Sequence, residues 1–130
     1  MIPDRGRVLV VDDEPGVAMV LTELLEGEGY DVRHTANGHE ALQVAAEWVP
    51  DVVVLDLTLP GMNGAEVARR LRALPDVAVS QVPIVVVTGA HAGIGTASDI
   101  GAFAAIRKPF GLDRVLSAVQ GAVEASRTLV

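Results

Sequence analysis

The chain has 130 residues and a mass of 13.6 kDa, which is the size of one domain. Half of its residues are hydrophobic, so we expect a folded core, and no apolar run approaches the length of a membrane span. Seventeen acidic residues against ten basic ones give a net charge of −7, which disfavours nucleic-acid binding, and the absence of cysteine excludes disulfides and thiolate chemistry. Residues Met1–Arg7 carry charged side chains and no apolar stretch, so no signal peptide is predicted and the cytoplasm is the expected location.

Apolar segments alternate with segments of helical periodicity along the whole chain. The expected strands, in chain order, are Arg7–Val11, Asp31–Thr35, Val52–Leu55, Pro83–Val87 and Phe103–Ile106. The expected helices are Pro15–Gly27, a segment capped by Asn37 and ending at Trp48, Ala65–Leu74, His91–Ile100 and Phe110–Arg127. Glu40 stands three residues after Asn37, as in a capping box, whereas Gly93 and Gly95 weaken the helix that contains them.

The first, third and fourth expected strands have no polar alternation, which is typical of strands buried on both faces. Such strands belong to parallel sheets covered by helices. We therefore predict an α/β fold: a doubly wound (βα)5 domain with a five-stranded parallel sheet in the flavodoxin-like order 2-1-3-4-5. The whole chain, residues 1–130, is expected to form this single domain. Ligands of such folds bind at the carboxyl ends of the strands.

Five polar side chains follow or end these strands: Asp12, Asp13, Asp56, Thr88 and Lys108, the last being the only lysine in the chain. Clustered carboxylates repel one another unless a cation neutralises them. Hard oxygen ligands, with no histidine or cysteine expected nearby, favour Mg²⁺. The lysine and the hydroxyl suit phosphoryl oxygens, and an aspartate beside the metal can act as a nucleophile toward phosphorus. The pattern indicates a Mg²⁺-dependent site that accepts a phosphoryl group.

Each of these residues also has an ordinary structural interpretation. Asp12 and Asp13 could cap the helix that begins at Pro15, and Asp56 could be a turn residue. Thr88 could simply end a strand, and Lys108 could be a solvated surface charge. Their coincidence at the expected strand ends favours the functional interpretation.

These residues resemble the receiver domain of two-component response regulators. Four segments carry the resemblance, in the order and at the spacing of that family: Val10–Glu14, Pro50–Asp56, Leu57–Gly64, and Val87–Gly89 together with Lys108–Phe110. The resemblance covers essentially the whole chain.

The resemblance implies a role for each matching residue. Asp56 would be the phosphoacceptor, and Thr88 and Lys108 would bind the phosphoryl group. The implied metal ligands are Asp12, Asp13, Asp56 and the backbone carbonyl of Thr58. The bond between Lys108 and Pro109 is usually cis in the family. The donor is normally a phosphohistidine on a histidine kinase or a phosphotransfer protein, and hydrolysis of the aspartyl-phosphate resets the domain. These are signalling proteins rather than enzymes acting on a separate substrate.

Two departures from the family concern the output. An aromatic residue usually stands three positions before the lysine, where this chain has Ala105. Phe103 lies two residues earlier and, in a regular strand, would share the face of Ala105 and could replace that aromatic. The segment His91–Ile100 is unusually rich in glycine. These departures motivate an alternative, a receiver-like protein-interaction module whose phosphorylation is silent.

Other functions fit the sequence less well. Thr88–Gly95 matches TGxxxGIG, as in short-chain dehydrogenases, but this loop follows the fourth strand, and no tyrosine–lysine catalytic pair is available for an oxidoreductase. The acids after the first strand would repel the phosphate of FMN, and the Asp56 segment lacks the second acid of aspartate-dependent phosphatases. We find no motif of an effector domain, so the output is expected to pass through a downstream protein or a domain outside this sequence.

Overall fold

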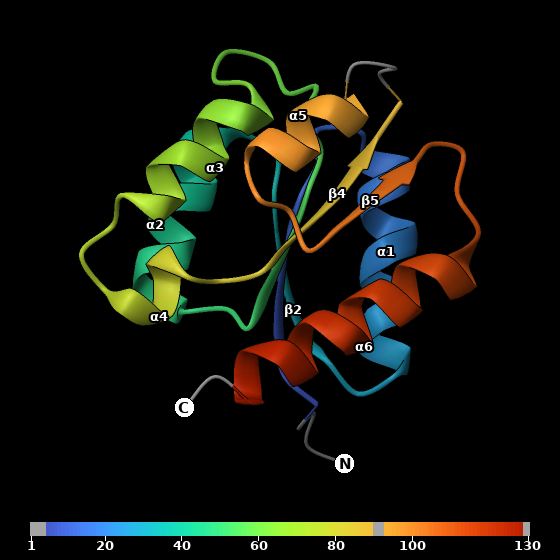
Figure 1. Ribbon diagram of the computed structural model, residues 1–130. Coiled ribbons are helices and arrows are strands. Elements are labelled where there is room, and N and C mark those ends of the chain that lie inside the picture. Colours follow the sequence, from blue (N-terminus) through green and yellow to red (C-terminus); the bar gives the residue numbers. More distant parts are fainter. Residues whose placement is uncertain (1–4, 90–92, 129–130) are drawn as a thin grey trace.

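The computed structural model describes residues 5–89 and 93–128, and its centre is a five-stranded parallel sheet (Figure 1). The strands are β1 (Arg7–Val11), β2 (Asp31–Thr35), β3 (Val52–Leu55), β4 (Ile84–Thr88) and β5 (Ala104–Arg107). Their order across the sheet is β2-β1-β3-β4-β5, and every neighbouring pair is parallel. The predicted fold class and strand order are therefore confirmed.

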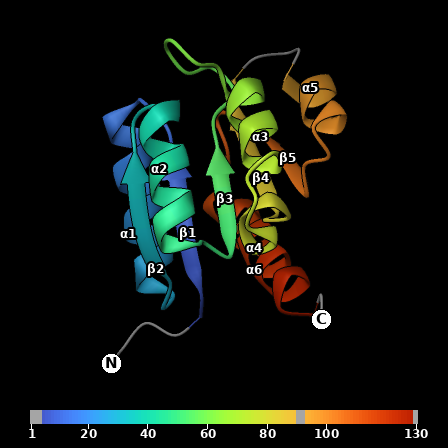
Figure 2. The same ribbon diagram turned by 90° about the vertical axis from the view of Figure 1, so that its left-hand side faces the viewer.

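Helices cover both faces of the sheet, as Figures 1 and 2 show. They are α1 (Pro15–Gly27), α2 (Gly38–Trp48), α3 (Gly64–Arg72), α4 (Val77–Ser80), α5 (Gly93–Asp99) and α6 (Leu112–Thr128). Alternate residues of the central strands face opposite layers: Val8 and Val10 of β1 belong to the core layer that contains α1 and α6, whereas Leu9 and Val11 belong to the layer that contains α2, α3 and α5. This double burial is why β1, β3 and β4 are apolar on both sides.

The short helix α4, between α3 and β4, was not predicted. Four residues are too few to show helical periodicity, and the run Val77–Val79 is as apolar as a strand. The signal that could have revealed it is Asp76, whose side chain accepts a hydrogen bond from the backbone N–H of Ala78 and so caps the helix.

The predicted cap of α2 is confirmed. The Asn37 side chain accepts a hydrogen bond from the N–H of Glu40, and its amide donates to the Glu40 carboxylate. Helix α5 begins at Gly93; the expected start at His91 lies outside the described residues. Val49, which ends α2, has a left-handed φ of 52°, a strained conformation for a β-branched residue.

Candidate functional site

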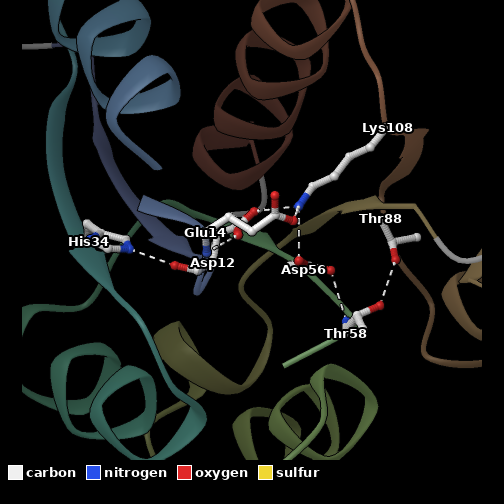
Figure 3. A network of polar contacts seen from close by, with 7 residues as sticks. All are labelled: Asp12, Glu14, His34, Asp56, Thr58, Thr88 and Lys108. Atoms are coloured by element: carbon white, nitrogen blue, oxygen red, sulfur yellow. Dashed lines mark hydrogen bonds and ion pairs between the residues drawn. The ribbon is translucent and has the colours of Figure 1, made fainter. Parts of the chain in front are cut away.

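The carboxyl ends of β1, β3, β4 and β5 meet at one edge of the sheet (Figure 3). Asp12 follows β1, Asp56 follows β3, Thr88 ends β4 and Lys108 follows β5. Two backbone hydrogen bonds, both 3.0 Å long, hold these ends together. The N–H of Asp56 donates to the carbonyl of Val11, and the N–H of Lys108 donates to the carbonyl of Thr88. The predicted convergence of these side chains is confirmed.

Three carboxylates form an acidic cluster. Asp12, Asp13 and Asp56 each place one oxygen within 4.8 Å of the others. Asp12 and Asp56 are 2% and 3% exposed, whereas Asp13 is exposed to solvent. Burial raises the pKa of Asp12, although hydrogen bonds from the Glu14 N–H and from Lys108 oppose that rise. A close set of hard, anionic oxygens fits Mg²⁺ by size and by ligand chemistry.

The ammonium group of Lys108 lies among the carboxylates. It is 3.0 Å from Oδ2 of Asp12, 2.9 Å from Oε1 of Glu14 and 3.0 Å from Oδ2 of Asp56. Burial favours the neutral amine, but the hydrogen bonds to these three carboxylates prevail, and the pKa of Lys108 is raised. One cation thus partly neutralises the cluster, and it contacts the residue expected to be the phosphoacceptor.

The segment after β3 fixes the second oxygen of Asp56. The N–H of Thr58 donates to Oδ1 of Asp56 at 2.9 Å, and the hydroxyl of Thr58 lies 3.4 Å from that of Thr88, which is fully buried. Gly64 lets α3 approach this segment: a Cβ there would lie 2.5 Å from Cα of Leu57 and 2.6 Å from the carbonyl oxygen of Asp56. Glycine is therefore required where the helix begins.

The prediction that Phe103 shares the face of Ala105 is wrong. Strand β5 begins at Ala104, so regular alternation does not extend back to Phe103. The ring of Phe103 lies against Gly121 of α6 and is 46% exposed, whereas Ala105 packs on the opposite layer. The ring of Phe103 therefore does not lie on the face of Ala105 in this structure. The peptide bond between Lys108 and Pro109 is cis.

Two contacts in Figure 3 were not predicted from the sequence. Glu14 was treated only as part of a motif, yet its carboxylate binds Lys108. No histidine was expected near the acids, but Nε2 of His34, on β2, lies 2.8 Å from the backbone oxygen of Asp12. The pairing of His34 with Val10 in the sheet register is the signal that places it there.

A doubly wound sheet that carries an acidic cluster and a lysine at one edge defines a domain of the CheY-like flavodoxin fold. The chain belongs to the response regulator receiver domain family, whose model matches residues 8–120. This membership decides against the dehydrogenase, flavin-binding and phosphatase alternatives. Among the described residues, no helix is long and apolar enough to span a membrane.

Relatives support the same membership. The chain is 32% identical over 116 residues to sporulation initiation phosphotransferase F of Bacillus subtilis, covering 88% of this chain and 90% of that protein. It is 39% identical over 127 residues to the transcriptional regulatory protein YkoG of Bacillus subtilis, covering 96% of this chain but only 54% of YkoG. The chain therefore spans about half the length of that regulator.

A solved structure gives the same result for the fold. The response regulator receiver domain protein from Clostridium thermocellum superposes with a TM-score of 0.85 at 25% identity, covering 95% of this chain and 98% of that one. The chain is thus a receiver domain of two-component signalling proteins.

Proposed function

We propose that this domain accepts a phosphoryl group on Asp56 in a Mg²⁺-dependent reaction and thereby switches a surface that binds a partner. One observation carries the proposal: Asp56 is buried, and it lies between the ammonium group of Lys108 and the carboxylates of two further aspartates. A structural carboxylate would gain nothing from two acidic neighbours, because their repulsion costs stability. The cluster is favourable when a cation and a phosphoryl group bind there.

Asp56, Lys108 and Thr88 have different roles in the transfer of the phosphoryl group. A carboxylate oxygen of Asp56 forms a bond to the phosphorus of the donor, while the bond from phosphorus to the donor's imidazole nitrogen breaks and that nitrogen keeps the electron pair. The ammonium group of Lys108 donates a hydrogen bond to Asp56 at 3.0 Å. After the transfer it donates to a phosphoryl oxygen instead. The Thr88 hydroxyl binds a second phosphoryl oxygen. Catalysis then consists of positioning and charge neutralisation.

The metal would be held by the carboxylates of Asp12, Asp13 and Asp56 and by the backbone carbonyl of Thr58. When bound, Mg²⁺ supplies positive charge that lowers repulsion between these carboxylates and the incoming phosphoryl oxygens. The sequence places Thr58 two residues after Asp56, and its N–H already binds that carboxylate. This contact ties the segment that carries the Thr58 carbonyl to the acidic cluster.

We assign the phosphodonor to a histidine kinase or a histidine phosphotransfer protein. The similarity to sporulation initiation phosphotransferase F, along most of both chains, supports a role in a phosphorelay. Residues 1–130 are assigned to one receiver domain. The output passes to a downstream protein or to an effector domain outside this sequence, since the similar regulator YkoG is about twice as long.

One observation favours a second candidate, a protein-interaction module with silent phosphorylation. The position of the usual aromatic is Ala105, and Phe103 packs against α6 instead of replacing it. A domain without that aromatic could bind partners in a way that phosphorylation does not change.

Intact mass tests whether the domain accepts a phosphoryl group, and partner binding measured before and after labelling separates a switched surface from a silent one. The protein is incubated with acetyl phosphate, with and without Mg²⁺, beside the variant Asp56→Asn. The proposal predicts a gain of one phosphoryl group that requires Mg²⁺ and is absent in the variant. If neither acetyl phosphate nor a phosphorylated histidine donor labels the protein, the proposed function is wrong; if the protein is labelled but its partner binding does not change, the silent module is correct. Labelling that survives in Asp56→Asn would contradict the assignment of the phosphoacceptor.

A further inference from the structure

His34 lies on β2, the edge strand next to β1. Its register partner is Val10, whose side chain faces the layer of α1 and α6. The imidazole borders a shallow pocket with residues of α1, among them Pro15 and Met19. Its ring therefore lies over the start of α1, next to the segment that carries the first two acids (Figure 3).

The imidazole completes a hydrogen-bond ladder that the backbone leaves unfinished. The N–H of Asp12 donates to the carbonyl of Thr35 at 3.2 Å, the last rung between β1 and β2. In a parallel ladder, a residue whose N–H donates to the neighbouring strand also points its carbonyl toward that strand. The Asp12 carbonyl would therefore accept from the amide two residues after Thr35. That residue is Asn37, which has left the sheet to cap α2. Nε2 of His34 lies 2.8 Å from this carbonyl and must carry the hydrogen, since a carbonyl only accepts.

The peptide group held in this way joins Asp12 to Asp13. The Asp12 side chain has further support, because it accepts from the Glu14 N–H at 2.9 Å and binds Lys108. Within residues 5–89 and 93–128, the Asp13 carboxylate makes no side-chain hydrogen bond or ion pair. The direction of Asp13 therefore depends on its backbone, and the bond from His34 holds the carbonyl of the peptide that joins Asp12 to Asp13.

We propose that His34 is a positioning residue for the metal site: it orients the peptide between Asp12 and Asp13 and so sets the affinity of the acidic cluster for Mg²⁺. The inference rests on the proposed function, since it assumes that the cluster binds Mg²⁺. Partners outside the ligand shell commonly govern metal affinity by fixing the ligands before the metal arrives.

The test measures Mg²⁺ binding to the unphosphorylated protein by calorimetry in four proteins. His34→Leu removes the donor and should weaken binding by roughly five- to tenfold. His34→Gln places an amide N–H near the position of Nε2 and should restore most of the affinity. His39→Leu is the matched control: His39 is exposed near the start of α2, no hydrogen bond or ion pair joins it to the cluster within the described residues, and its loss should leave the affinity unchanged. Unfolding temperatures in EDTA verify that each variant is folded.

A spectroscopic measurement on the unmodified protein makes the proposal independent of any variant's folding. Long-range ¹H–¹⁵N NMR of the imidazoles should show that Nε2 of His34 carries a hydrogen. A neutral His34 with its hydrogen on Nδ1 would overturn the proposal. Equal Mg²⁺ affinity in His34→Leu and in the unmodified protein, or failure of His34→Gln to restore binding, would also overturn it while leaving the proposed function intact. If the unmodified protein does not bind Mg²⁺, the proposed function fails and the inference fails with it.

Discussion

Replacing Asp13 with asparagine removes one charge from the acidic cluster while keeping the shape of the side chain. Asp13 is exposed, so the substitution disturbs no packed core. If the cluster is kept for a cation, the metal-free protein should become more stable when one of its charges is lost. The same variant should gain less stability from Mg²⁺, because it loses a ligand.

The size of the effect follows from the spacing of the carboxylates. Two unit charges 4.8 Å apart repel by about 0.9 kcal/mol in water and by about 3.5 kcal/mol at an effective dielectric constant of about 20. Solvent screening around the exposed Asp13 favours the lower figure for each of its two neighbours, and Lys108 offsets part of the sum. We therefore expect a net gain of about 1 kcal/mol, or about 3–4 °C in the unfolding temperature of a domain of this size.

Thermal unfolding in EDTA and in excess Mg²⁺ provides the assay. Asp13→Asn should unfold at a higher temperature than the unmodified protein in EDTA. In Mg²⁺ the order should reverse, since a ligand at 100 times its Kd stabilises the protein that binds it by about 2.7 kcal/mol. Glu47→Gln, exposed on α2, makes the same change in net charge and should show neither effect. The reasoning is refuted if Asp13→Asn is no more stable than the unmodified protein in EDTA.

Three further predictions concern stability. Gly64→Ala should destabilise the domain by about 3 kcal/mol in urea unfolding, because its Cβ would meet backbone at 2.5 Å, whereas Gly16→Ala, with nothing within 4 Å, should be neutral or slightly stabilising. Val49→Gly should change the free energy of unfolding by less than about 1 kcal/mol, because relief of the left-handed strain offsets the lost packing of a half-buried side chain and the added freedom of the unfolded chain; a loss of about 2 kcal/mol or more would show that the strain is not relieved. Burial raises the pKa of Asp12 in the native protein, so the metal-free native state takes up a proton there more readily than the unfolded chain. In EDTA at neutral pH, Asp12→Asn should be more stable than the unmodified protein, because it lacks this buried charge. The difference in stability should shrink as the pH falls toward 3.8, the ordinary pKa of an aspartate, and a difference that stays constant with pH would count against the raised pKa of Asp12.

The sequence predicted the architecture because three strands are apolar on both faces and their neighbours are helical. It also predicted the acids, the hydroxyl and the lysine of the site, since each directly follows or ends a strand. Short elements were harder to find: α4 spans four residues and has no period to detect. The placement of Phe103 was wrong because Phe103 lies just before β5, where the alternation of side chains along the strand no longer applies.

Contacts between distant segments could not be derived from the chain order. His34 reaches Asp12 because β2 pairs with β1 in a particular register and then leaves the sheet. Glu14 reaches Lys108 across 94 positions of sequence because the ends of β1 and β5 open onto the same edge of the sheet. The sequence shows which polar residues are available for such a network, whereas the pairing register of the strands decides which of them come into contact.

The central claim is that Asp56 carries the phosphoryl group, and chemical trapping tests it most directly. The protein is treated with acetyl phosphate and Mg²⁺, reduced with borohydride, which converts an aspartyl-phosphate into homoserine, and digested for peptide mass spectrometry. We predict homoserine at position 56, dependent on both Mg²⁺ and the phosphodonor. Homoserine at position 12 or 13, or a labelled protein without homoserine at position 56, would contradict the account.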